Sequence, residues 1–236
     1  MRIAIIGVPG LGVERVQQMF RSNWKMYNFI DYHEYSEQKT DNINADIINL
    51  ATQMLSEIKK YDKMDDNVIF TSIPLELLMT SFSLCEQKEI TEDTVKKLAE
   101  LSNESLKYLD CVFIVPKSKF NAVEDVSVTS DEIDYFGQLY DIIIHSYNYG
   151  EKCPFFNLND CPGFIEIFGT DEQKLQLFKQ YIDENGKLID GNIQKLLSPE
   201  EISEDQEMLQ NAIEHNKHIQ KKEAFWKQLN QYKHRK

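Results

Sequence analysis

The sequence predicts an α/β domain with a parallel sheet, followed by a helical C-terminal extension, and three observations favour it. Short apolar runs alternate with longer segments of helical periodicity along most of the chain. The runs are almost continuously apolar, which is typical of strands covered on both faces. The 236 residues are enough for one such domain and an appendage. We therefore expect a three-layer domain over residues 1–187 and an extension over residues 188–236.

The first 61 residues supply two predicted strands and two predicted helices. The first strand is a continuous apolar run, and the second is marked by aromatic residues. The helices show apolar residues at helical spacing. In order, the predictions are a strand over Arg2–Ile6, a helix from Gly12 through Phe20, a strand over Trp24–Tyr32 and a helix over Asp46–Tyr61.

The same alternation continues to residue 182. Pro74 begins one helix, Thr91 is a suitable N-cap for the next, and Thr170 with Gln173 forms a capping box. Residues 117–130 are predicted to be irregular. The remaining predictions are strands over Asn67–Ser72, Cys111–Val115 and Phe164–Phe168, and helices over Leu75–Cys85, Thr91–Leu109, Asp131–Tyr147 and Asp171–Ile182.

After Gly186 the pattern changes to a long polar segment. Ser198, Pro199 and Glu201 are typical of a helix start, and neither glycine nor proline follows them. We interpret Glu200–Lys233 as one long helix or a broken pair with a narrow apolar stripe. It could pack along the domain, or the 198–236 segment could bind a protein partner.

Composition excludes several functions. The net charge of −13 disfavours binding to nucleic acid and to anionic membranes. No apolar run approaches the roughly 20 residues that span a bilayer, and the first apolar run is too short for a signal peptide. The four cysteines have no C-x-x-C pairing, so we expect free thiols, a cytoplasmic location and no metal site.

The segment after the first strand matches a phosphate-binding loop in its glycines but not in its charged residues. Such a loop follows the pattern G-x-x-x-x-G-K-[ST] between a buried strand and a helix. Gly7 and Gly12 are in place, but Val13 and Glu14 replace Lys and Ser/Thr. Backbone N–H groups could still bind an anion, whereas Glu14 would oppose it. Arg15 is displaced by about 200° around the helix from the lysine position. The candidate phosphate-binding residues are Gly7, Pro9, Gly10, Gly12, Val13, Glu14 and Arg15.

Five segments follow one another in a fixed order: Gly7–Gly12, Phe70–Leu78, Tyr108–Pro116, Glu132–Tyr147 and Phe164–Ile167. Together they resemble one family, the P-loop nucleoside and nucleotide kinase-like proteins. These are also described as AAA-type ATPases of the NadR or thymidylate-kinase kind and are common in phage genomes. The resemblance covers about residues 1–182. It implies a P-loop NTPase-like fold and ATP or another nucleotide with Mg²⁺ as ligand.

This sequence departs from the family pattern at most positions that would carry catalysis. Thr71 and Ser72 stand where the family has an acid and an arginine, while Glu76 replaces the second aspartate. The lid would need arginines near residues 125–130, and there is no arginine from residue 22 to residue 234. We therefore expect lost or altered catalysis.

Five further residues could form a residual site, and each has an alternative role. Asp31 could face a substrate or metal, or belong to a solvated loop. Glu76 could be a remnant metal-site carboxylate or a helix cap. Lys117 and Lys119 could replace the missing arginines or be surface lysines, and Thr71 ends a predicted strand.

Three functional hypotheses follow. The first is a degenerate kinase-like protein that has at most a weakened nucleotide site. The second is a non-enzymatic interaction protein that uses its acidic surface and the C-terminal helix, and that modulates a host if a phage encodes it. The third is an active kinase with relocated catalytic residues.

Overall fold

The computed structural model describes residues 1–31, 42–63, 66–118, 128–149 and 162–189. The chain divides into two units, Met1–Ile189 and Asp190–Lys236. The second unit lies outside the described residues, and so do the helix predicted over Glu200–Lys233 and the partner surface predicted over 198–236. The domain boundary at residues 187/188 stays a prediction.

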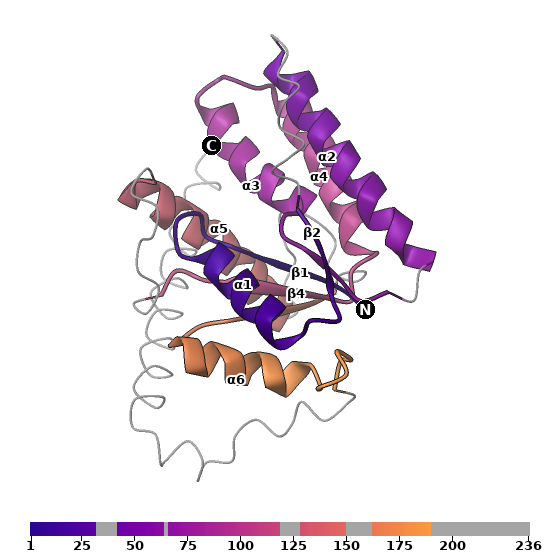
Figure 1. The fold of residues 1–236 in the computed structure, drawn as a ribbon. Helices are drawn as coiled ribbons and strands as arrows, with labels where there is room; N and C mark the ends of the chain where they lie inside the picture. The colour runs from indigo at the N-terminus through magenta and orange to yellow at the C-terminus, as the bar shows by residue number, and fades with distance from the viewer. Residues whose placement is uncertain (32–41, 64–65, 119–127, 150–161, 190–236) are drawn as a thin grey trace. The chain divides into compact units, whose positions relative to one another are not determined.

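The first unit is built on five parallel strands in the order β2-β3-β1-β4-β5 (Figure 1). Central β1 pairs with β3 on one side, where Ile3 lies opposite Ile69, and with β4 on the other, where Ile3 lies opposite Cys111. The predicted parallel sheet is therefore confirmed. The strands are β1 (Arg2–Gly7), β2 (Asn28–Ile30), β3 (Val68–Phe70), β4 (Cys111–Val115) and β5 (Gly163–Glu166).

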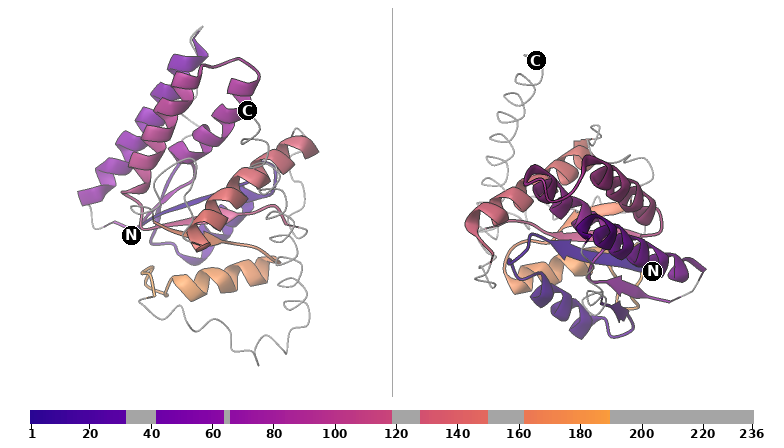
Figure 2. Two further views of the ribbon diagram at one scale, coloured as in Figure 1. Left: turned by 180° about the vertical axis from the view of Figure 1, so that it is seen from behind. Right: turned by 90° about the horizontal axis from the view of Figure 1, so that it is seen from above.

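Helices cover both faces of the sheet, as Figures 1 and 2 show. On one face lie α1 (Val13–Asn23) and α6 (Asp171–Tyr181), whose core is an aromatic cluster. The other face carries α2 (Ile43–Lys60), α3 (Pro74–Glu86), α4 (Glu92–Leu106) and α5 (Ser130–Tyr149), and a short 3₁₀ turn, η2 (Tyr61–Lys63), follows α2. The three-layer α/β class is thus confirmed.

Local sequence signals begin several of these helices. Thr91 caps α4 by accepting a hydrogen bond from the N–H of Thr94. Thr170 and Gln173 form the predicted capping box of α6, and Pro74 occupies the first position of α3. These signals work because they satisfy or remove N–H groups that a helix start leaves without partners.

The predicted strand over Trp24–Tyr32 is wrong in its first half, because among its described residues, 24–31, only Asn28–Ile30 form a strand. Trp24 instead ends α1, and its ring stacks on Phe20 with ring centroids 4.6 Å apart. The Tyr27 ring meets Phe20 edge to face. These aromatic side chains pack α1 against α6. Because aromatic residues are also enriched in strands, their local sequence pattern predicted a strand instead.

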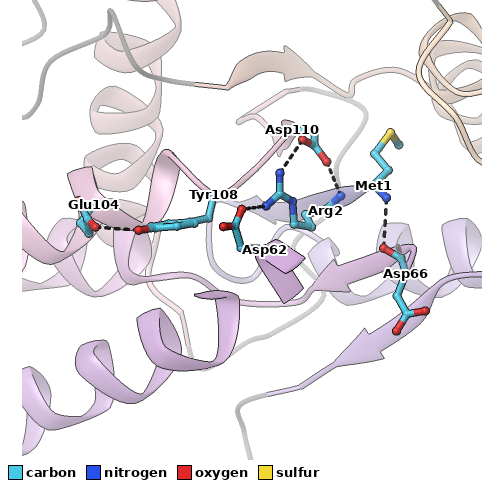
Figure 3. A network of polar contacts seen from close by, with 7 residues as sticks. All are labelled: Met1, Arg2, Asp62, Asp66, Glu104, Tyr108 and Asp110. Atoms are coloured by element: carbon cyan, nitrogen blue, oxygen red, sulfur yellow. Dashed lines mark hydrogen bonds and ion pairs between the residues drawn. The ribbon is translucent and has the colours of Figure 1, made fainter. Parts of the chain in front are cut away.

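The amino ends of β1 and β4 are joined by a polar network (Figure 3). Asp110 accepts from the backbone N–H of Arg2 at 2.7 Å and from its guanidinium at 3.1 Å. The same guanidinium donates to Asp62 at 2.5 Å, and the amino group of Met1 donates to the carbonyl of Asp66 at 3.2 Å. This network stabilises the edge opposite the candidate site.

Candidate functional site

The connections leaving the strands diverge at the carboxyl edge of the sheet. After β1 the chain crosses to α1 on one face, whereas after β3 and β4 it crosses to α3 and α5 on the other (Figure 1). Open α/β sheets bind their ligands where neighbouring connections diverge in this way, because a crevice forms there. The loop Val8–Gly12 lies at this edge.

The backbone of this loop is shaped for a tight turn into α1. Gly10 and Gly12 adopt φ values of 77° and 74°, which favour glycine. The N–H of Leu11 donates to the carbonyl of Val8, and the first helical bond runs from Val16 to Gly12. Within the described backbone, the N–H groups of Val13 and Glu14 donate to no carbonyl. They point out of a helix start that has no side-chain cap, which is the geometry of a backbone anion site.

Gly7 has a packing role that the sequence motif did not suggest. A Cβ at Gly7 would lie 2.4 Å from the carbonyl oxygen and 2.7 Å from the Cβ of Val115. The N–H of Val8 also donates to the carbonyl of Val115 at 3.1 Å. Gly7 therefore permits the close approach of β1 and β4 at the root of the loop.

The side chains after the loop point to different places. Val13 packs against the aromatic cluster, and Glu14 is exposed in the first turn of α1. Arg15 forms an ion pair with Asp171 at the start of α6. Val13 carries no charge and the guanidinium of Arg15 is paired with a carboxylate, so neither side chain adds net positive charge at the helix start.

Asp31 and Thr71 meet at the ends of β2 and β3. The hydroxyl of Thr71 lies 3.3 Å from the carboxylate of Asp31 and 3.2 Å from the carbonyl of Ile30. The structure thus brings two of the predicted residues together at the carboxyl edge of the sheet.

Gln17 is a structural residue of this edge that the sequence analysis missed. Its amide donates to the carbonyl of Ile5 at 2.7 Å and to that of Thr71 at 2.9 Å, and the side chain is buried. It therefore joins the ends of β1 and β3. A signal was available, because Gln17 follows Val16 and precedes Phe20 by three positions on the buried side of α1.

Glu76 caps the start of α3. Its carboxylate accepts from the hydroxyl of Ser72 at 2.6 Å and from the N–H of Ile73 at 3.1 Å. Burial raises the pKa of Glu76 to about 7, although both hydrogen bonds act to lower it. The hydroxyl of Tyr140 in α5 has its pKa raised by burial and by the charge of Glu76. Ser72 and Tyr140 were not singled out by their sequence context as neighbours of this carboxyl.

Lys117 lies beside the loop in a hollow of about 230 Å³. Its ammonium forms an ion pair with Asp134 of α5. The predicted residue Lys119 lies outside the described residues. The hollow is lined by Leu11, Lys117, Ser118, Val128, Ser130, Ile133 and Asp134.

The described residues contain neither a cluster suited to a metal ion nor a helix suited to span a membrane. In these parts of the chain no three His, Cys, Asp or Glu side chains form a cluster that could hold a metal ion. None of the described helices combines the length and the apolar character needed to cross a membrane.

Comparison with known proteins gives a likeness to solved structures alone. No protein-family model matches the chain. No curated protein matches it either. Deoxyadenosine kinase from M. mycoides with products dCMP and a flexible dCDP bound superposes with a TM-score of 0.49 and 16% identity, over 76% of this chain and 97% of that one. The same enzyme with dCTP gives 0.48 and 16%, over 76% and 98%, and with dATP 0.48 and 15%, over 76% and 98%.

Proposed function

We propose that this protein is a degenerate member of the P-loop nucleoside and nucleotide kinase-like proteins. In this proposal the loop Val8–Gly12 retains a weakened site for the phosphate of a nucleotide, and phosphoryl transfer is impaired. The observation that carries the proposal is the glycine loop at the diverging edge, where α1 begins with N–H groups that could bind an anion. The segment order Gly7–Gly12, Phe70–Leu78 and Tyr108–Pro116 supports the family resemblance.

Impairment follows from the charges around the loop. Phosphoryl transfer depends on cations that stabilise the charge of the moving group. Val13 supplies none, Glu14 adds a negative charge, and Arg15 and Lys117 are each paired with an aspartate. Binding of a triphosphate through backbone N–H groups alone is weak under these conditions, and turnover is weaker still. We place the protein in the cytoplasm, of the host if a phage encodes it, because nucleotides and reduced thiols are found there.

The test is calorimetric titration with ATP, GTP and deoxynucleotides, with and without Mg²⁺. We expect millimolar affinity for the natural protein and at least tenfold tighter, Mg²⁺-dependent binding for the double variant Val13→Lys with Glu14→Thr. Glu14→Gln is the matched control, since it removes the negative charge without supplying a lysine. We expect the control to gain less than the double variant. If the double variant binds no nucleotide at millimolar concentration, the loop is not a phosphate site.

A second candidate function is protein binding through the 198–236 segment, favoured by the net charge of −13 and by the strong helix start at Ser198 and Pro199. Deletion of residues 198–236 should then abolish capture of the partner while the α/β unit stays folded by circular dichroism. Capture that survives the deletion would remove this candidate.

The third candidate is an active kinase with relocated catalytic groups. Glu76, with a pKa of about 7, is a candidate for proton transfer at this edge, and the carboxylate of Asp31 with the hydroxyl of Thr71 is a candidate for contact with a substrate. Incubation with ATP and a panel of nucleosides tests it. Absence of phosphorylated product above a no-enzyme control would exclude it for those nucleosides.

A further inference from the structure

The segment that leads into α5 is packed against the glycine loop. A Cβ added to Gly10 would lie 3.1 Å from the Cβ of Val128 and 3.2 Å from its Cγ2. The natural side chain of Val128 therefore already occupies the space next to the α-carbon of Gly10. Leu11 is 3% exposed and shares the hydrophobic core with Ile133 of α5. The loop and the start of α5 thus form one packed unit.

The charge beside the loop is held by the same helix. The stem of Lys117 runs across Gly137, where an added Cβ would lie 3.2 Å from the Cβ of the lysine. Its ammonium is paired with Asp134, one turn earlier in α5. Leu11 and Val128 line the same hollow as this ion pair. Accordingly, the cation beside the loop is already partnered by an anion of the protein.

We infer that residues 128–134, which lead into α5 and form its first turn, are an autoinhibitory cover for the loop, in which Val128 packs on Gly10 and Asp134 neutralises Lys117. An oxyanion at the loop, either pyrophosphate or the phosphate group of a nucleotide, binds only when Val128 moves away and Lys117 exchanges Asp134 for the ligand. This inference rests on the proposed function, because it assumes that the loop accepts an anion. It adds a reason for weak binding that is separate from the substitutions at Val13 and Glu14.

The first experiment measures pyrophosphate affinity by calorimetry after Asp134→Asn. The change is made in the natural protein and in the Val13→Lys, Glu14→Thr background, where affinity is measurable under the proposed function. We expect binding to tighten threefold to tenfold. Asp131→Asn is the matched control, since it removes the same charge from the exposed first turn of α5, and it should change affinity less than twofold. Lys117→Met should abolish the gain from Asp134→Asn.

The second experiment tests the apolar half of the cover without any ligand. Val128→Ala should accelerate hydrogen exchange about fivefold or more at two N–H groups of the loop: that of Val8, which donates to the carbonyl of Val115 in β4, and that of Leu11, which donates to the carbonyl of Val8. Val95→Ala on α4, another partly buried valine of the same core, is the control and should leave these two rates unchanged. Unchanged exchange after Val128→Ala would overturn the cover.

The outcomes separate this inference from the proposed function. If the Val13→Lys, Glu14→Thr variant binds pyrophosphate and Asp134→Asn adds no more than Asp131→Asn, the autoinhibitory pair is refuted while the anion site stands. If that variant binds no pyrophosphate, with or without Asp134→Asn, the anion site is refuted, and the inference fails with it.

Discussion

The substitution Glu76→Gln should make the protein more stable at neutral pH. The folded state raises the pKa of Glu76 to about 7, against an ordinary value of 4.5. The hydroxyl of Ser72 and the N–H of Ile73 both donate to a single oxygen of the carboxylate. A glutamine side-chain oxygen can accept both of these hydrogen bonds, so the substitution preserves the cap of α3 and removes only the ionisation.

The direction of the effect follows from proton uptake. Between pH 4.5 and 7 the folded protein keeps a proton on Glu76 that the unfolded chain releases. The free energy of unfolding of the natural protein therefore decreases as the pH rises through this window. At about 1.36 kcal/mol for each pKa unit, the decrease due to Glu76 is roughly 3 kcal/mol. Glu76→Gln does not titrate and is spared this loss.

Urea unfolding at pH 4.5, 5.5, 6.5 and 7.5 measures the effect as a difference between variant and natural protein, so that other titrating groups cancel. The difference should grow in favour of Glu76→Gln by roughly 3 kcal/mol across the series. Glu132→Gln is the matched control, because Glu132 caps α5 in the same way but is exposed and has its pKa lowered by hydrogen bonds from Thr129. Its difference should stay flat from pH 5.5 to 7.5. A flat difference for Glu76→Gln as well would refute the argument from burial.

Three other substitutions test the packing that positions the loop. Gly7→Ala should lower the free energy of unfolding by roughly 3 kcal/mol and clearly lower Tm in thermal unfolding, since its Cβ would meet the backbone of β4. A Cβ at Gly163 in β5 would lie 3.9 Å from the hydroxyl of Tyr147, an ordinary contact distance, so Gly163→Ala should change Tm little. Gln17→Leu leaves two carbonyls at the ends of β1 and β3 without their donor and should lower the free energy of unfolding by urea by about 1–3 kcal/mol. The control Gln18→Leu, at an exposed neighbouring position, should change it by no more than about 0.5 kcal/mol. Equal effects of the two substitutions would contradict the role of Gln17 in joining β1 and β3. Phe178→Ala leaves a cavity at the centre of the aromatic cluster and should lower the free energy of unfolding, measured by calorimetry, by about 3–5 kcal/mol. A smaller decrease would mean that the surrounding side chains move in to fill the cavity.

The elements that the sequence predicts best are those with a continuous apolar run or a capping signal. β4 occupies the predicted Cys111–Val115, and the capping box at Thr170 begins α6. Both signals are local, because they depend on residues only a few positions apart. The first half of the strand predicted over Trp24–Tyr32 was wrong because the Trp24 ring packs against Phe178, which follows 154 positions later in the chain. No local pattern contains that contact.

In the candidate site, too, some features follow from local sequence whereas others depend on tertiary contacts. The loop and its position after β1 follow from the order of residues, and so does the placement of Asp31 and Thr71 at strand ends, since carboxyl ends of parallel strands share an edge. The ion pairs that hold Arg15 and Lys117 depend on how α6 and α5 pack beside the loop, and no local sequence pattern predicts that packing. The position of Tyr140 near Glu76 likewise depends on the packing of α5 beside α3, which local sequence does not predict.

The place of β1 in the middle of the sheet has a consequence for synthesis of the chain. Ile3 pairs with Ile69 and Cys111, so its two partners leave the ribosome 66 and 108 residues later. At about 5–20 residues per second, this apolar strand stays without its neighbours for several seconds. Pairing over such separations is slow in folding as well, because long loops must close first. A nascent or truncated chain that ends before β4 therefore exposes one edge of an apolar strand that is buried in the folded protein, and such an edge favours aggregation and chaperone binding.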